Sequence, residues 1–374
     1  LPALLGSGSL LSDPAAVEAF AARAERAGPA LLSLVGLGGI WDALSVPGTR
    51  EGWLGHLTTA VVVVALVVAA RSPRRPAALA RPLWVLGLGS LAVAAATSVG
   101  PVADAVAALM GSVPGMGLLR DAQKWLAPFV VLAVLAVAVL VEDARRVARR
   151  RAPVLVQAVV VLAVVLPFAL LPDGAVVVHR VLAPVHYPTD FDQVEAALAR
   201  EPADTQGALA SAPWRLYRSY PWATGYATYD PSSRWFDVRV LMSDELVVGE
   251  RVLGGEDPWA ARVGVALAHP GAGTVDAVAR EGVRWLLVHR EDPDATELLD
   301  AVAGDPGATT VVDGRSLVLL RLAGTDVGAA RAAAPAPWTV LLVSLVDLAV
   351  LGALVLVAAS RASASGRERP VTLA

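Results

Sequence analysis

Five long apolar runs constrain the fold of this chain more than any other feature. Each is about 17 to 22 residues long and nearly free of charge; they cover residues 53–70, 82–99, 125–141, 152–171 and 338–359. That is the length an α-helix needs to cross a bilayer. With 56% hydrophobic residues, 17% charged residues and a mean hydropathy of +0.59, the chain has more apolar surface than one water-soluble core can bury. The sequence therefore predicts a polytopic α-helical membrane protein with about five transmembrane helices.

Arginine is concentrated in alternate connections between these runs. The three sets lie between the first and second runs, between the third and fourth, and after the fifth: Arg71, Arg74, Arg75 and Arg81; Arg145, Arg146, Arg149, Arg150 and Arg151; Arg361, Arg367 and Arg369. Alternating spans place all three sets on one side, which the positive-inside rule makes cytoplasmic. We therefore expect a multi-pass plasma-membrane protein with a basic cytoplasmic tail over residues 361–374.

The same topology assigns the other regions. Residues 1–52 are expected to form an extracytoplasmic loop with a short helix over residues 15–26, residues 53–171 a four-helix transmembrane region, and residues 337–360 the last transmembrane helix. Because the chain begins outside with Leu1 and has no recognisable signal sequence, we expect upstream spans to be missing. The apolar run at residues 30–40 is too short and too glycine-rich to span, so it is interpreted as a packed loop or a re-entrant segment.

Residues 172–336 form a long hydrophilic region, which the topology makes extracytoplasmic. Residues 172–337 contain 23 Asp and Glu residues against 14 Arg residues, so the region is acidic where the cytoplasmic connections are basic. Its pattern alternates between helices and strands: helices at 191–200, 274–281 and 294–302, a strand at 283–289, and a hairpin at 309–322 with an Asp-Gly turn. The sequence predicts an extracytoplasmic α/β domain inserted before the last transmembrane helix.

A polar segment precedes the third apolar run. Arg120, Asp121, Gln123 and Lys124 lie within five residues, and Lys124 is the only lysine in the chain. Arg120 and Lys124 would share one face of a continuing helix, whose N-terminus favours anions. One hypothesis is a lipid-phosphate site made by Arg120 and Lys124 with polar support from Asp121 and Gln123; the alternatives are a cation pair that reaches the lipid headgroups and packing against the outer domain.

Aromatic residues gather in one part of the predicted α/β domain. All five tyrosines fall between Tyr187 and Tyr229, and the densest part contains Trp214, Tyr217, Tyr220 and Trp222 beside two arginines. Aromatic faces next to arginines can hold sugar rings or rest on a membrane surface. These four residues are candidates for a glycan-facing surface, and the alternatives are a core and loop cluster or a membrane-docking surface.

Other chemistry is sparse. The chain has no cysteine, and its histidines lack metal-site spacing, so we expect no metal and no cofactor. Gly36-Leu37-Gly38-Gly39 lacks the lysine and the context of a phosphate-binding loop. Asp347 lies near the middle of the last apolar run, where a carboxyl group is usually paired or functional. No nucleic-acid partner is expected.

The layout of these motifs resembles a known family. The resemblance rests on the multiple spans, the outer loop ending at residues 114–125, and an outer α/β region with Pro213-Trp214 and the run Glu281-Gly282-Val283-Arg284-Trp285. Together they are similar to membrane proteins of the C-type glycosyltransferase superfamily in actinobacteria, in the style of YfhO-like proteins and arabinofuranosyltransferases, of which this chain would be the C-terminal portion.

The resemblance implies transfer of a sugar on the outer face of the membrane. The donor would be a polyprenyl-phosphate sugar in the membrane lipid, and the acceptor a cell-envelope glycan or lipid. The family's catalytic carboxylate lies in an upstream outer loop that this sequence lacks, so the catalytic residue stays unknown, and the lipid-phosphate role of Arg120 and Lys124 is the part carried over. The alternatives are a non-catalytic envelope scaffold that binds glycan or a partner protein, and a flippase.

Overall fold

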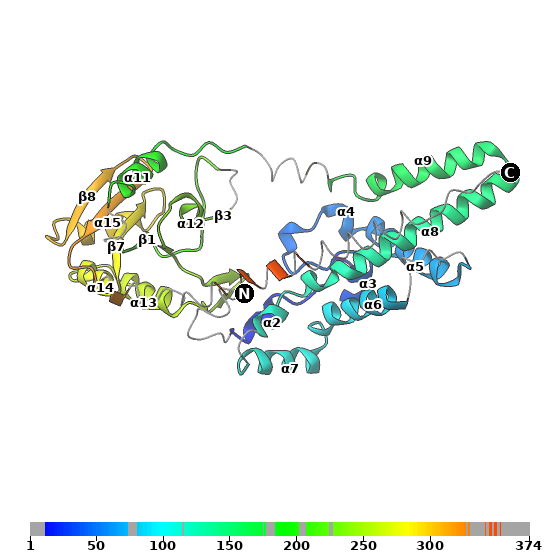
Figure 1. The fold of residues 1–374 in the computed structure, drawn as a ribbon, viewed down its shortest axis with the longest axis horizontal. Helices are drawn as coiled ribbons and strands as arrows, with labels where there is room; N and C mark the ends of the chain where they lie inside the picture. The colour runs from blue at the N-terminus through cyan, green and yellow to red at the C-terminus, as the bar shows by residue number, and fades with distance from the viewer. Residues whose placement is uncertain are drawn as a thin grey trace.

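A computed structural model of the protein describes residues 12–73, 81–113, 116–174, 184–201, 207–223 and 227–326, together with residue 176 and scattered residues between 328 and 352. Figure 1 shows an elongated molecule with a sheet at one end and long helices at the other. The combination of apolar helices with a separate α/β region agrees with the prediction from the sequence.

The described part of the helical region contains four long apolar helices. They are α5 (Trp53–Arg71), α6 (Arg81–Ala96), α8 (Ala127–Arg151) and α9 (Pro153–Leu170). α8 lies against α5, α6 and α9, and its contacts with α5 and α6 form a core of small and branched side chains that includes Val62, Ala65, Ala94, Leu132 and Ala136. Such small-residue contacts are typical of helices that pack within lipid.

The prediction of about five spans is not supported. In the part of the chain that the structure describes, only α5 and the helix Gln123–Arg151 are long and apolar enough to cross a membrane by themselves. A third span is counted if α6 and α7 (Gly100–Met110), which are bent by 86° at the break between them, act together. Residues Val154–Leu170 of α9 form a shorter apolar helix. The run at 338–359 lies outside the continuously described residues.

The N-terminal part folds into short pieces: α2 (Ala15–Ala19), α3 (Ala30–Val35), the 3-10 helix η1 (Ala43–Ser45) and α4 (Gly48–Glu51). The helix expected at 15–26 stops at Ala19, because the chain turns to bury the side chains of Glu25 and Arg26. The segment after α3 is a loop in which Leu37 and Gly39 have positive φ. Gly39 donates its N–H to the buried Glu25 carboxylate at 2.7 Å, so this glycine-rich loop holds a carboxylate of the chain itself.

The α/β region is built on a five-stranded sheet. Its strand order is β4 (Val240–Leu241), β1 (Ala208–Ala212), β7 (Val283–His289), β9 (Leu317–Leu322) and β8 (Ala308–Asp313). β4, β1 and β7 are parallel, and β9 and β8 are antiparallel additions. Two small ribbons accompany it, β2 (Tyr217–Arg218) with β3 (Thr228–Tyr229), and β5 (Leu246–Val248) with β6 (Arg251–Leu253).

Helices bury both faces of this sheet. One face packs against α13 (Pro258–Leu267), α14 (Thr274–Arg280) and α15 (Ala295–Val302) through a core that includes Val263, Val278 and Leu298. The other face packs against α11 (Asp190–Leu198) and the segment around α12 (Ser232–Trp235). In Figure 1, α11 lies on the opposite side of the strands from α13 and α14. β7 is buried along almost its whole length, as expected for a central parallel strand.

Several elements match their predicted positions. The predicted helices at 191–200, 274–281 and 294–302 are α11, α14 and α15, and the predicted strand at 283–289 is β7. The predicted hairpin is formed by β8 and β9. The sequence did not reveal β1, α13 or the two small ribbons. β1 is rich in alanine, which has little β-propensity, and each ribbon strand has only two or three residues.

The α/β region contacts the helical region through the β5–β6 ribbon. Its Leu246, Val248 and Leu253 pack with Ala16 and Val17 of α2 and with Met110 of α7 in one apolar cluster. Arg251 of the ribbon forms an ion pair with Glu18 of α2 at 2.8 Å. The ribbon is therefore one of the elements through which the sheet region contacts the helices.

Candidate functional site

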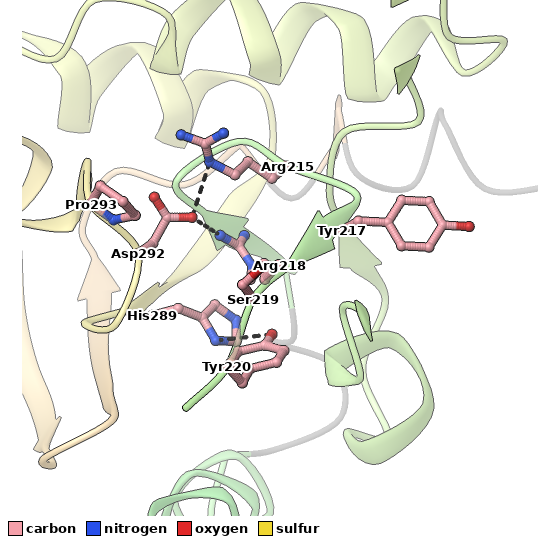
Figure 2. Close-up of a pocket in the computed structure, with 8 residues that line it drawn as sticks. All are labelled: Arg215, Tyr217, Arg218, Ser219, Tyr220, His289, Asp292 and Pro293. Carbon is pink, nitrogen blue, oxygen red and sulfur yellow. Dashed lines mark hydrogen bonds and ion pairs between the residues drawn. The ribbon is translucent and has the colours of Figure 1, made fainter. Parts of the chain in front are cut away.

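A polar cavity of about 260 Å³ lies at the carboxyl ends of the parallel strands β1 and β7. This edge of a parallel sheet is where α/β proteins commonly bind ligands, because the loops that leave neighbouring strands converge there. Figure 2 shows the lining residues, which come from the loop after β1 and from the end of β7: Arg215, Tyr217, Arg218, Ser219, Tyr220, His289, Asp292 and Pro293.

A buried hydrogen-bond network lies between the cavity and the end of strand β1. Ser211 of β1 donates from Oγ to Asp230 Oδ2 at 2.5 Å, and its Oγ lies 3.0 Å from His289 Nε2. The Tyr220 hydroxyl lies 3.4 Å from Nδ1 on the other side of the same ring. A neutral His289 with its proton on Nε2 satisfies each contact, because it donates to Ser211 and accepts from Tyr220.

The electrostatics favour this arrangement. Burial lowers the pKa of His289 below its usual value, even though the Asp230 carboxylate acts in the other direction. Burial alone would raise the pKa of Asp230, but the hydrogen bond from His289, followed by the charge of Arg218 and the hydrogen bond from Ser211, holds that pKa well below its usual range. Burial and the nearby Asp230 charge raise the pKa of Tyr220. At neutral pH the network therefore contains an ionised aspartate, a neutral imidazole and a neutral phenol.

These residues do not form a Ser-His-Asp nucleophile. A catalytic triad places the serine on one ring nitrogen of the histidine and the aspartate on the other. Here Asp230 Oδ2 and Ser211 Oγ both lie near Nε2, at 3.4 Å and 3.0 Å. Ser211 is also fully buried within a strand. This geometry excludes a hydrolase activity at Ser211. The network instead holds the side chains that line the cavity in place.

Paired charges form the wall of the cavity. The buried Arg218 lies 3.0 Å from Asp230 through Nε and 2.9 Å from Asp292 through Nη1. Arg215, at the surface, contacts Asp292 at 3.0 Å and also pairs with Asp294. Three carboxylates face two guanidinium groups, so the wall has no spare positive charge for an anion. It presents fixed donors and acceptors, the arrangement that suits a neutral, hydroxyl-rich ligand.

The four aromatic candidates occupy different positions. Tyr217 is 46% exposed, and its ring extends outward at the edge of the cavity in Figure 2. Tyr220 is buried and stacks on Trp222 with ring centroids 4.4 Å apart, while Trp222 donates from Nε1 to Glu291 at 2.9 Å. Trp214 lines a neighbouring cavity of about 320 Å³ and packs against the core. Tyr217 is therefore the most exposed of the four, and its ring also makes a T-shaped contact with Tyr229, with ring centroids 5.9 Å apart.

Ser211, Arg218, Asp230 and His289 were missed as site residues at the sequence level. For His289 the sequence contains a usable signal, since a polar run from His289 to Asp292 begins at the last residue of the predicted strand 283–289. Residues at the carboxyl end of a buried parallel strand are natural site candidates. Asp230 and Arg218 could not be found in this way, because their approach depends on the fold of the β2–β3 ribbon.

The Arg120 to Lys124 segment is not one helix. It consists of the 3-10 helices η3 (Met116–Leu119) and η4 (Ala122–Leu126), separated at residues 120 and 121. The expectation that Arg120 and Lys124 share a helical face is therefore wrong. Arg120 contacts Glu256 of the α/β region at 3.0 Å, whereas Lys124 is 74% exposed and pairs with Asp121 at 2.9 Å.

The remaining candidates are placed as follows. Gln123 donates from Nε2 to the carbonyl of Gly39 at 2.7 Å, which ties this segment to the glycine-rich loop. Asp347 lies outside the described residues. Among the described residues, no group of three or more His, Cys, Asp or Glu side chains is arranged to hold a metal ion.

The fold and its apolar helices define a membrane protein with an α/β region at one end. No protein-family model matches the chain. No curated protein matches it. A solved structure with some similarity is the cryo-EM structure of the arabinofuranosyltransferase AftD from mycobacteria, at 17% sequence identity and a TM-score of 0.36. The match covers 87% of this chain and 30% of that one. A similarity at this level does not indicate an activity.

Proposed function

We propose that this chain is part of a membrane glycosyltransferase that moves a sugar from a polyprenyl-phosphate donor to a cell-envelope glycan or lipid. In this proposal residues 172–336 form an extracytoplasmic domain that binds the glycan acceptor. Residues 53–171 and 337–360 lie in the plasma membrane, where the lipid-linked donor is dissolved.

The observation that carries the proposal is the chemistry of the cavity at β1 and β7. Asp292 and Arg215 present charged acceptors and donors that are held in place by their mutual ion pair. Sugar hydroxyls can both donate to such carboxylates and accept from such guanidinium groups. The exposed face of Tyr217 at the edge of the cavity can stack against a sugar ring. These features suit a neutral saccharide better than an anion.

Lys124 is proposed to contact the phosphate of the lipid donor. Its ammonium group is exposed and stands at the start of the candidate span Gln123–Arg151, the level at which a lipid headgroup lies. The acceptor oxygen would bond to the anomeric carbon as the bond from that carbon to the phosphate oxygen breaks, and the hydroxyl proton would pass to the departing phosphate. The ammonium group would offset the charge that develops on the leaving oxygen. In this scheme Arg120 positions the α/β region through Glu256, and Asp121 and Gln123 orient Lys124.

One observation favours a second function, a non-catalytic scaffold that binds envelope glycan. The buried carboxylates beside the cavity, Asp230 and Asp292, are both held by Arg218. The pKa of Asp230 is held well below its usual range, so this carboxylate has little capacity to accept a proton from an acceptor hydroxyl. A scaffold would use the same saccharide site without a general base.

Saccharide binding is tested with the full chain in lipid nanodiscs by titration calorimetry. A neutral envelope-type oligosaccharide is compared with one of equal length that carries uronic acids. We expect saturable binding of the neutral sugar, at least tenfold weaker binding of the acidic sugar, and at least tenfold weakening by Tyr217→Ala. The control Arg262→Gln, which removes an exposed ion pair on α13, should bind as wild type. Absence of saccharide binding, or a preference for the acidic sugar, would contradict the proposal.

A further inference from the structure

α7 lies at a sharp angle to the apolar helix that precedes it. α6 presents large apolar side chains outward, including Val85, Leu86 and Leu88, and α7 departs from it with a bend of 86°. The break covers residues 97–99, and Gly100-Pro101 directly after it form the first turn of α7, where proline is well tolerated. If α6 runs along the membrane normal, α7 runs along the membrane surface.

One face of α7, called its inner face, packs against α2 and the β5–β6 ribbon at a depth in contact with water. Met110 is buried, and Ala103, Val106 and Ala107 pack beside it against α2 and the β5–β6 ribbon. The Glu18–Arg251 ion pair that joins α2 to this ribbon is exposed, with side-chain exposures of 74% and 48%. An exposed ion pair cannot lie in the hydrocarbon core without a large cost. α7 is therefore excluded from the depth of the bilayer.

The outer face of α7 is apolar and has no partner among the described residues. Val102, Ala105 and Leu109, followed by Val113 beyond the helix, are all exposed and follow the spacing i, i+3, i+7 and i+11, so they form one stripe along the helix. The only charged residue of the helix is Asp104, which lies on a different side from this stripe. The stripe is continuous in the chain with the outward-facing apolar residues of α6.

We propose that α7 is an in-plane membrane-surface helix, whose Val102–Leu109 stripe enters the boundary between the headgroups and the acyl chains of the outer leaflet. The partner of this surface is the phospholipid bilayer itself. Interfacial helices adopt this arrangement, in which the apolar face enters the lipid and the opposite face lies against polar or hydrated parts of the protein. Because α2 and the β5–β6 ribbon rest on its inner face, α7 sets the height of the α/β region above the membrane. This inference does not depend on sugar transfer.

The test uses single cysteines, since the chain has none of its own. Four single-cysteine variants are spin-labelled and reconstituted into phosphatidylcholine vesicles: Val102→Cys, Leu109→Cys, Asp104→Cys and Val134→Cys. The last lies on the exposed side of α8 and serves as the reference for a deep position. Collision with oxygen, which enters lipid, is compared with collision with a water-soluble nickel chelate. Labels at 102 and 109 should lie at a depth between those at 104 and 134, with nickel accessibility at least threefold below that at 104.

Three outcomes would overturn the proposal. Equal nickel accessibility at positions 102, 104 and 109 would mean that the stripe faces water. A depth at 102 and 109 equal to that at 134 would mean that α7 is re-entrant. Spectral broadening between labels, removed by dilution with unlabelled chain, would mean that a second copy covers the stripe. Loss of saccharide binding by the nanodisc-embedded chain would leave this depth measurement unaffected.

Discussion

Arg120 Nη1 lies 3.0 Å from Oε1 of Glu256, a residue 136 positions further along the chain. The contact joins the segment before the candidate span Gln123–Arg151 to the loop that precedes α13. Ser12 donates from Oγ to the same carboxylate oxygen at 2.7 Å, and the Arg120 guanidinium lies over the Phe20 ring. The loop that carries Glu256 is itself fixed, because the Asp244 carboxylate accepts the N–H groups of Glu256 and Asp257.

A double-mutant cycle measures this contact. Arg120→Gln and Glu256→Gln, alone and together, are compared by chemical unfolding of the detergent-solubilised chain. Because both side chains are partly exposed, we expect a coupling energy of about 0.2–1 kcal/mol, which falls in high salt. A coupling energy near zero at low salt would show that the ion pair does not join the two regions in solution.

Asp230→Asn should destabilise the α/β region much more than loss of a surface charge. The substitution leaves Arg218 buried with only Asp292 as an ionic partner, and breaking a buried pair costs about 3–5 kcal/mol. The matched control is Glu281→Gln, which breaks the exposed pair with Arg262 and should cost less than about 1 kcal/mol. Both values come from urea unfolding followed by tryptophan fluorescence. Equal effects of the two substitutions would contradict the buried network.

The network also makes a prediction about pH. His289 has a lowered pKa in the folded chain, so the unfolded state binds its proton first as pH falls below about 6.5. Stability is then lost on acidification, by at most about 1.4 kcal/mol per pH unit for one proton. Asp230, whose pKa is also lowered, adds a loss in the same direction below about pH 4, where its unfolded carboxyl is protonated.

His289→Gln keeps a donor near Ser211 but removes the titration. We expect lower stability than wild type at pH 7.5 and a flatter dependence between pH 7 and 5, measured as thermal midpoints. If the variant retains the full wild-type slope in this interval, another group controls the acid sensitivity.

Gly38 is predicted to tolerate no side chain. A Cβ at this position would collide with the guanidinium of Arg50 and the carboxylate of Glu25, which form a largely buried ion pair at 2.9 Å. Gly38→Ala should therefore force the pair apart and destabilise the chain by up to about 3 kcal/mol. Gly89→Ala on α6 meets no atom within 4 Å and should be neutral or slightly stabilising. A thermal midpoint for Gly38→Ala equal to that of Gly89→Ala would contradict this packing.

The fold was predictable where local pattern decides it. α14 and β7 were predicted as a helix that leads through Gly282 into a strand, and the β8–β9 hairpin was predicted from its Asp-Gly turn. The number of spans was not predictable, because apolar composition does not show that Gly100-Pro101 starts a helix in a new direction.

The candidate site was predictable only in part. Tyr217 and Tyr220 were predicted from aromatic clustering and both line the cavity. The spacing of Arg120 and Lys124 assumed a continuous helix, but the chain breaks into two 3-10 helices so that Arg120 can reach Glu256. That contact depends on residues 136 positions apart, and no local pattern encodes it.

Sugar transfer in membranes that carry this chain tests the central proposal most directly. Vesicles with and without the chain are supplied with a radiolabelled polyprenyl-phosphate sugar and a neutral envelope glycan, and label in the glycan is counted. The proposal predicts transfer that requires the chain and falls at least tenfold with either Lys124→Gln or Tyr217→Ala, while Arg262→Gln transfers at the wild-type rate. Equal transfer with and without the chain, or full activity of Lys124→Gln, would contradict it.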